Sequence, residues 1–265
     1  MSTAGICIIV LDHRHDQYLR DLLDGIRLHC PDVSVALYNS GGKPPGPAFG
    51  DLPILPHCSR LHYAKVTPFF LDLLEWMVDR NFEYVINAET DMAFIRPGFE
   101  EFVYRTMKDS DYLAPGFVRT TPRTSRWRPY RSLRAELPEL LSIIGTAQTN
   151  RCFSPGQIFS SRYASAVVGS PWYSDLRDFV TRNQEAGKSF SLQEVLLPTL
   201  ADALRLRVAN YPGHLASVNR YRPYHAASGV FRCRNIPDAY FMHPIRRDDQ
   251  DPARLIVRDG LGRTT

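Results

Sequence analysis

The chain has 265 residues, of which 44% are hydrophobic, and its formal net charge is +4. This length is enough for a sizeable core in one large domain or two small ones, while so modest a charge argues against a nucleic-acid partner. The longest apolar run near the start, residues 6–11, is far shorter than the roughly 20 residues of a membrane-spanning helix, and no signal-peptide pattern surrounds it. We therefore expect a cytoplasmic protein without a membrane span.

The five cysteines are widely spaced and contain no CxxC pair, which argues against a structural zinc site. Their odd number also argues against a disulfide framework. We expect reduced, mostly buried thiols.

Only four of the 32 basic residues are lysines. Guanidinium groups bind phosphate oxygens bidentately, although a GC-rich coding sequence gives the same bias. One stretch, residues 119–134, combines arginines with Trp127 and Tyr130, a composition that also suits a nucleic-acid surface. No recognition module accompanies it, so we do not favour that function. The arginines are Arg119, Arg123, Arg126, Arg128, Arg131 and Arg134.

Residues 5–12 (GICIIVLD) predict a buried strand, residues 16–29 an amphipathic helix and residues 33–38 a second strand. A β-α-β opening predicts a parallel sheet with a right-handed crossover, which binds ligands beyond the carboxyl ends of its strands. The side chains found there are Asp12, His13 and Arg14, although Asp12 or Asp16 also suits the helix N-cap.

Residues 40–60 are rich in Gly and Pro and predict a loop, after which Thr67-Pro68 predicts the N-cap and first turn of a helix. Residues 82–86 (FEYVI) predict a strand that leads into Glu89-Thr90-Asp91. Alternate side chains of an extended segment share a face, so Glu89 and Asp91 can reach one Mn²⁺ or Mg²⁺. An ordinary acidic turn is the alternative.

A helix starting near Pro97 and a strand over residues 112–115 continue the alternation. We expect an α/β fold with a mostly parallel central sheet flanked by helices. We also expect a single domain over residues 1–265, with a nucleotide-binding half (1–115) and an acceptor-side half (116–265).

In the second half, residues 153–160 predict a turn and a short strand, and residues 137–144, 163–168 and 172–180 predict helices. Ser191 precedes another helix and stands three residues before Glu194, the spacing of a capping box. The alternative role for Glu194 is that of a general base at the ligand edge of the sheet.

Residues 240–247 (YFMHPIRR) predict an apolar strand that ends in a histidine and two arginines. His243 is either structural, a third metal ligand or a phosphate contact. Arg246 and Arg247 are candidates to stabilise a leaving diphosphate.

The order of these motifs resembles that of the GT-A glycosyltransferases. In that family the end of the first strand touches the base of a nucleotide-sugar, which implies this role for Asp12, His13 and Arg14. An acidic motif of the DxD type holds ribose and metal, and Glu89-Thr90-Asp91 matches it with Glu in the leading position.

The second half resembles the core-2/I-branching N-acetylglucosaminyltransferases. Residues 154–169 (SPGQIFSSRYASAVVG) are similar to that family's Ser-Gln-Trp turn and following helix, which implies that Gln157 contacts the nucleotide-sugar. Residues 191–202 (SLQEVLLPTLAD) are similar to the segment carrying its catalytic glutamate, which implies Glu194. Its C-terminal basic residues, which bind the diphosphate without metal, correspond to Arg246 or Arg247. That family lacks an acidic metal motif and is membrane-anchored, so metal dependence stays open here.

We therefore expect transfer of a sugar from a nucleoside-diphosphate sugar, with UDP favoured, to a hydroxyl-bearing acceptor. Glu194 would act as the base and the product would be inverted, in a bacterial natural-product or polysaccharide pathway. The alternatives are a retaining enzyme with a metal held by Glu89, Asp91 and His243, a nucleotidyltransferase, and a non-catalytic nucleotide-sugar-binding module.

Overall fold

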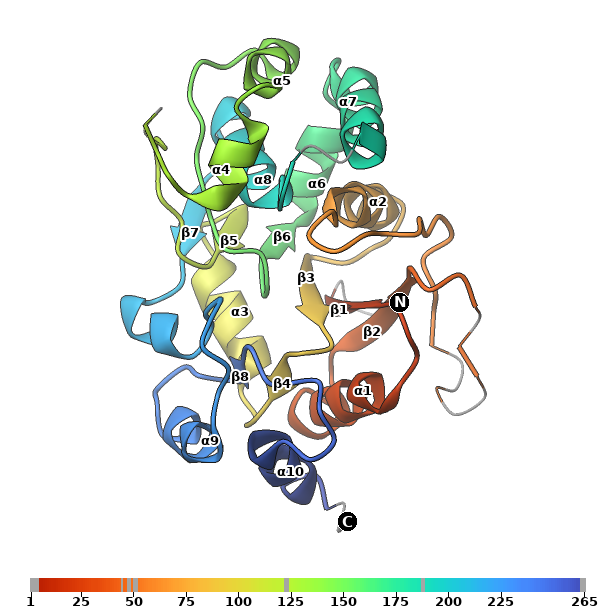
Figure 1. Ribbon diagram of the computed structural model, residues 1–265, viewed down its shortest axis with the longest axis vertical. Helices are drawn as coiled ribbons and strands as arrows, with labels where there is room; N and C mark the ends of the chain where they lie inside the picture. The colour runs from red at the N-terminus through yellow and green to blue at the C-terminus, as the bar shows by residue number, and fades with distance from the viewer. Residues whose placement is uncertain are drawn as a thin grey trace.

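A single six-stranded sheet runs through the molecule in the order β2-β1-β3-β6-β5-β7 (Figure 1). The computed structural model describes residues 5–43, 45–46, 49, 52–121, 124–186 and 189–262, so Arg123 lies outside the described residues. The first three strands in this order are parallel, β6 is antiparallel to both neighbours, and β7 is parallel to β5. The strands are β1 (Ile6–Asp12), β2 (Ser34–Asn39), β3 (Tyr84–Glu89), β5 (Tyr112–Ala114), β6 (Ile158–Ser160) and β7 (Val208–Asn210).

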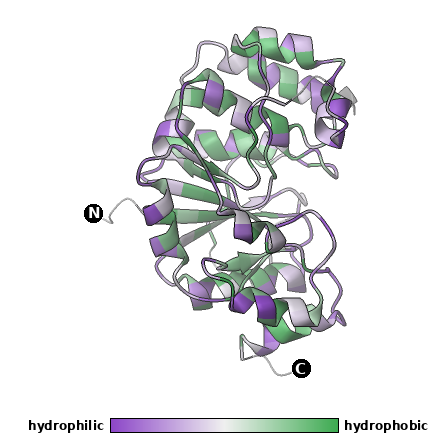
Figure 2. Ribbon diagram, turned by 90° about the vertical axis from the view of Figure 1, so that its left-hand side faces the viewer, coloured by the Kyte–Doolittle hydropathy of each residue, from purple (hydrophilic) through white to green (hydrophobic). Residues whose placement is uncertain are grey.

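Strand β1 is buried along its whole length because helices cover both faces of the sheet. Its alternating side chains enter two separate hydrophobic cores: Ile8 faces one and Ile9 the other. Burial on both faces explains why this strand is a continuous apolar run rather than an alternating pattern. Figure 2 shows the largely hydrophobic strands between two layers of helices, along which hydrophobic and hydrophilic residues alternate.

One face of the sheet packs against α1 (Gln17–His29), α3 (Phe99–Met107), α9 (Ala227–Arg234) and α10 (Pro252–Asp259). The other packs against α2 (Thr67–Val78), α4 (Arg128–Leu133), α5 (Leu137–Ile144), α6 (Ser161–Val168), α7 (Tyr173–Ala186) and α8 (Gln193–Ala203). A 3-10 helix, η2, covers Gly213–Ser217. Among the described residues, no helix is long and apolar enough to cross a membrane.

The expected α/β class with a mostly parallel sheet is confirmed. Asp16 caps α1 through bonds from the backbone N–H groups of Tyr18 and Leu19. The expected N-cap at Thr67 is wrong, because Val66 is the cap and Thr67 is already helical. The short helix α4 and strand β7 were not expected from the sequence.

A two-stranded ribbon beside the main sheet joins β4 (Ala93–Phe94) to β8 (Phe241–Met242). The strands are antiparallel, with Ala93 opposite Met242. Just beyond the ribbon, the Ile245 N–H donates to the Asp91 carbonyl at 2.8 Å. These bonds hold the segment after β3 against the C-terminal part of the chain.

The turn before β6 depends on Gly156, which has a φ of +78°. A Cβ atom there would lie 2.6 Å from Cζ of Phe241. The Gly156 carbonyl also accepts a 2.6 Å hydrogen bond from the Tyr211 hydroxyl. The turn therefore needs a residue without a side chain.

We expect Gly156→Ala to lower the free energy of unfolding by about 1–3 kcal/mol, because the positive φ and the contact with Phe241 both penalise a side chain. Chemical denaturation measures the change. Gly213→Ala is the matched control, since a Cβ atom there meets nothing within 4 Å. Equal stability of the two variants would contradict this account of the turn.

Candidate active site

One pocket lies at the carboxyl ends of β1 and β3. Six of the candidate site residues predicted from the sequence form part of its wall. This edge is where parallel α/β sheets bind their ligands. His13 follows β1, Glu89 ends β3, and the bonds around the β4–β8 ribbon bring the C-terminal segment to the same edge. The six are His13, Glu89, Asp91, Glu194, His243 and Arg247.

Asp91 and His243 face each other, with Nε2 of the imidazole 3.5 Å from Oδ1 of the carboxylate. The other ring nitrogen, Nδ1, lies 2.9 Å from the carbonyl oxygen of Arg220. A carbonyl only accepts, so Nδ1 carries a proton, and Nε2 faces Asp91 either with a second proton, which makes the ring a cation, or with the lone pair of the neutral ring. Oδ1 of Asp91 is buried and has no hydrogen-bond partner. Two acceptors in this arrangement require a proton or a metal ion between them.

Arg247 adds a second cation, with its guanidinium 3.5 Å from the same oxygen of Asp91. Burial alone would raise the pKa of Asp91, but the close contact with His243 and its charge, together with Arg247, lower it to about 2. Burial raises the pKa of Glu89, and the charge of Asp91 raises it further. The pocket thus contains one firmly ionised carboxylate and a neighbour that resists ionisation.

The side chains of this pocket supply some, but not all, of the ligands that a divalent cation needs. In the ranges that the structure describes, no three His, Cys, Asp or Glu side chains are arranged to hold a metal ion. Asp91 and His243 nevertheless offer a buried, unbonded oxygen and an oriented imidazole lone pair. Mg²⁺ commonly uses one or two protein ligands, completed by waters and substrate phosphates. Two protein ligands, with Glu89 beside them, are therefore enough for such a site.

Glu194 lies in the first turn of α8, and its Oε1 accepts a hydrogen bond from the backbone N–H of Ser154 at 3.2 Å. The capping-box alternative is wrong: the N-cap is Leu192, no side chain caps the helix, and Ser191 has a φ of +51°. Burial raises the pKa of Glu194 to about 8, against the lowering effect of the Ser154 bond and with a smaller raising effect from Glu89. A carboxyl group with such a pKa suits proton transfer near neutral pH.

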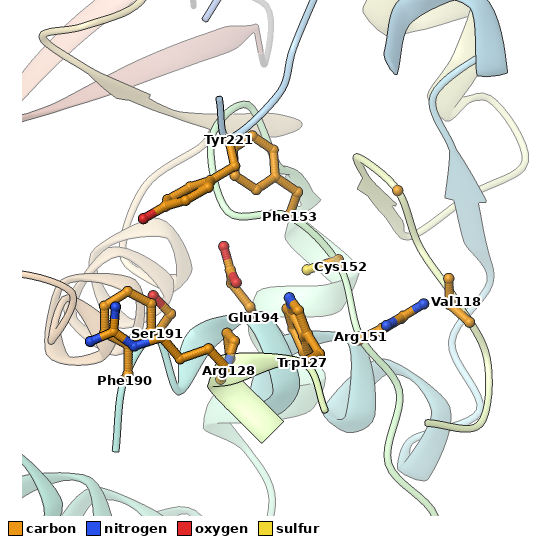
Figure 3. A pocket seen from close by; sticks show the side chains of 12 residues that line it. Val118, Trp127, Arg128, Arg151, Cys152, Phe153, Phe190, Ser191, Glu194 and Tyr221 are labelled. Atoms are coloured by element: carbon orange, nitrogen blue, oxygen red, sulfur yellow. The ribbon is translucent and has the colours of Figure 1, made fainter. Parts of the chain in front are cut away.

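Glu194 also lines a second, larger cavity on its other side (Figure 3). The carboxyl group points away from α8, toward the rings of Tyr221 and Phe153. The two cavities therefore meet at this side chain. The residues common to both linings are Phe153, Phe190, Ser191, Glu194 and Tyr221.

Other predicted site residues lie outside the lining of the first pocket. Asp12 is buried and accepts bonds from the backbone N–H groups of Arg14 and His15, so it shapes the loop after β1. Arg14 is exposed. The Thr90 carbonyl lies 3.5 Å from the guanidinium of Arg254.

Gln157 and Arg246 also lie apart from this pocket. Gln157 is fully buried, and its amide donates to the carbonyl of Ser154 at 3.0 Å. It therefore supports the turn whose N–H binds Glu194. The exposed Arg246 guanidinium lies 5.2 Å from the ring centre of Tyr224 and lines a different cavity.

Sequence reasoning missed the side chains that enclose the pocket from the solvent side. The rings of Tyr63 and Phe190 lie edge to face with centroids 6.1 Å apart. A hydrogen bond to Tyr221 raises the pKa of the Tyr63 phenol, and burial raises it further. Arg222 also lines the pocket. The available signal was the basic and aromatic run of residues 220–224 (RYRPY).

The sequence matches no protein-family model and no curated protein. The fold is similar to that of the galactosyltransferase LgtC, solved with donor and acceptor sugar analogues, at 9% identity and a TM-score of 0.52 over 97% of this chain and 95% of that one. It is also similar to the glycosyltransferase GlyE of Streptococcus pneumoniae TIGR4, at 10% identity and a TM-score of 0.53, over 97% of this chain and 60% of that one. Identities this low show the fold alone, which is the expected GT-A fold. The finer resemblance to the core-2/I-branching family stays a prediction.

The raised pKa of Glu194 predicts a pH-dependent stability difference from Glu194→Gln. The pKa of this carboxyl group is 4.5 in the unfolded chain and about 8 in the folded protein. Its contribution to stability is therefore complete below pH 4.5 and is lost as the pH rises to 8, by at most about 1.4 kcal/mol per pH unit. Denaturation of both proteins across this range, without nucleotide, measures the difference. Parallel curves would show that Glu194 titrates normally.

Proposed function

We propose that this chain transfers a sugar from a nucleoside-diphosphate sugar to an acceptor hydroxyl. The observation that carries the proposal is the position of Glu194 between two cavities, one of which also contains Asp91, His243 and Arg247. A group-transfer enzyme needs such a meeting point between a donor and an acceptor. The GT-A fold supports this function, and a UDP-sugar is the first donor to test.

The donor's diphosphate fits the end of the pocket that contains the Asp91–His243 pair and Arg247. Mn²⁺ or Mg²⁺ held by Asp91 and His243, with Glu89 beside them, would neutralise the diphosphate and stabilise it as a leaving group. The guanidinium of Arg247 supplies hydrogen-bond donors to the same charge. Its contact with Asp91 at 3.5 Å keeps it at this end of the pocket before the donor binds.

Glu194 is the base in this proposal. The acceptor oxygen forms a bond to the anomeric carbon, the bond from that carbon to the diphosphate breaks, and the acceptor proton moves to a carboxylate oxygen of Glu194. The Ser154 N–H holds one of these oxygens, leaving the other for the acceptor. Attack from the face opposite the leaving group inverts the anomeric centre.

A retaining transferase is the second candidate, and the Asp91–His243 pair is the observation that favours it. That enzyme would use the same donor end of the pocket but no dedicated protein base. NMR of the product's anomeric configuration distinguishes the two mechanisms.

We expect a nucleoside diphosphate to raise the melting temperature in the presence of Mn²⁺ or Mg²⁺ but not EDTA. A ligand at 100 times its Kd adds about 2.7 kcal/mol to the free energy of unfolding. Asp91→Asn should abolish the metal-dependent part, whereas Asp175→Asn, an exposed change on α7, should preserve it. A shift that EDTA does not reduce would assign the diphosphate to arginines alone, and no shift with any nucleotide would reject the proposed donor.

We expect Glu194→Gln to reduce transfer by on the order of 10²-fold or more, because the amide cannot accept the proton. Nucleotide-induced stabilisation should persist, since donor phosphates bind at the other end of the pocket. Initial rates and melting temperatures measured on the same samples separate the two effects. Glu185→Gln, on the exposed surface of α7, is the matched control. A Glu194→Gln enzyme with substantial turnover would remove Glu194 from the mechanism.

A further inference from the structure

The cavity on the far side of Glu194 has the size and lining of a small-molecule site. Its volume is ≈ 420 Å³, within the range of about 300–1,000 Å³ that is usual for ligand pockets. Most of the lining is apolar, with aromatic side chains from α4's N-terminal flank, the turn before β6 and the loops at residues 190 and 221. The aromatic residues are Trp127, Phe153, Phe190 and Tyr221.

The charged groups of this cavity are unbalanced. Among the residues that the structure describes, Glu194 is the only carboxyl group in the lining, whereas Arg128 and Arg151 place two guanidinium groups there. Within the described part of the chain, neither arginine forms an ion pair with a carboxylate. Arginines nearby do so, as Arg119 does with Asp202 at 3.6 Å. The cavity therefore presents two uncompensated positive charges.

Aromatic rings hold both guanidinium groups in position. Arg128 lies over Phe190, with its Cζ 3.8 Å from the ring centre, and Arg151 lies 5.7 Å from the ring centre of Trp127. In Figure 3 these two pairs flank Glu194. Stacking on a ring leaves the edge of a guanidinium, with its N–H groups, free to bind an anion. A side chain already held in place loses less conformational entropy when a ligand binds.

We propose that this cavity is the acceptor subsite and that it selects acceptors carrying an anionic group, a carboxylate or a phosphate, which Arg128 and Arg151 bind. The inference rests on the proposed function, since it assumes that Glu194 receives the acceptor's proton. The aromatic walls cover the body of the acceptor, and the guanidinium groups bind its charge. The attacking hydroxyl is thereby directed toward Glu194.

The protonation of Glu194 is compatible with an anionic acceptor. Because burial raises its pKa to about 8, Glu194 is mostly neutral at pH 7 in the empty site and repels the ligand little, while the ionised minority, which grows as the pH approaches 8, is the form that accepts the acceptor's proton. A second carboxylate with an ordinary pKa would cancel much of the attraction of the arginines. The cavity therefore remains positive under the conditions in which an acceptor arrives.

The test compares the binding of matched aryl glycosides to the full chain by titration NMR. The probes are phenyl β-glucoside, phenyl β-glucuronide and the phosphorylated glucoside. We expect an acidic probe to bind the wild-type protein about tenfold more tightly than the neutral one, the value of one charge-assisted hydrogen bond. The combined change Arg128→Gln and Arg151→Gln should remove that preference, and Arg131→Gln, an exposed change on α4 outside the cavity, should preserve it.

Each outcome decides the proposal. Preference for the glucuronide alone identifies carboxylate acceptors, and preference for the phosphorylated probe alone identifies phosphate acceptors. Equal binding of neutral and acidic probes, no binding of either acidic probe, or a preference that survives the double substitution would overturn it. The melting temperature of the same samples with nucleotide reports on the donor pocket separately. Failure of the proposed function can therefore be distinguished from failure of the acceptor proposal.

Discussion

The burial of three carboxyl groups in one pocket is the constraint around which this molecule's site is organised. Glu89, Asp91 and Glu194 line one pocket, where burial penalises each negative charge. His243 and Arg247 act on both Glu89 and Asp91, but they lie 3.5 Å from a carboxylate oxygen of Asp91, and of the three groups its pKa is the one that is lowered. The other two keep their protons more tightly. The fold thus assigns different protonation states to three chemically similar groups through the positions of two basic side chains.

Those positions come from the β4–β8 ribbon and the bonds around it. The backbone bond from Ile245 to Asp91 carries the C-terminal segment to the end of β3. The His243 ring is then oriented by the Arg220 carbonyl, itself part of a loop that pairs with residue 243. Such a supporting shell fixes the tautomer of a ligand histidine. Secondary structure that looks peripheral to the sheet therefore determines the electrostatics of the site.

Local sequence patterns were enough to predict the main sheet strands of the first half. They also predicted that the acidic motif follows a strand. The apolar runs of β1 and β3 and the capping residue Asp16 indicate secondary structure through residues that are close together in the sequence. The partnership of Asp91 with His243 depends on contacts between distant segments, which no local period encodes. The Ser191–Glu194 spacing matched a capping box, but the positive φ of Ser191 and the Ser154 N–H gave the glutamate another partner. The second cavity is built from five separate segments and likewise left no single motif.

The wall shared by the two cavities limits how the protein can diversify. Phe153, Phe190, Ser191, Glu194 and Tyr221 belong to both linings, so a substitution at any of them alters two ligand environments at once. Trp127, Arg128 and Arg151 belong to only one. Substitutions at Trp127 and Arg128 therefore change the larger cavity alone, and laboratory libraries confined to α4 and its N-terminal flank would vary that cavity while the lining of the smaller pocket stays unchanged.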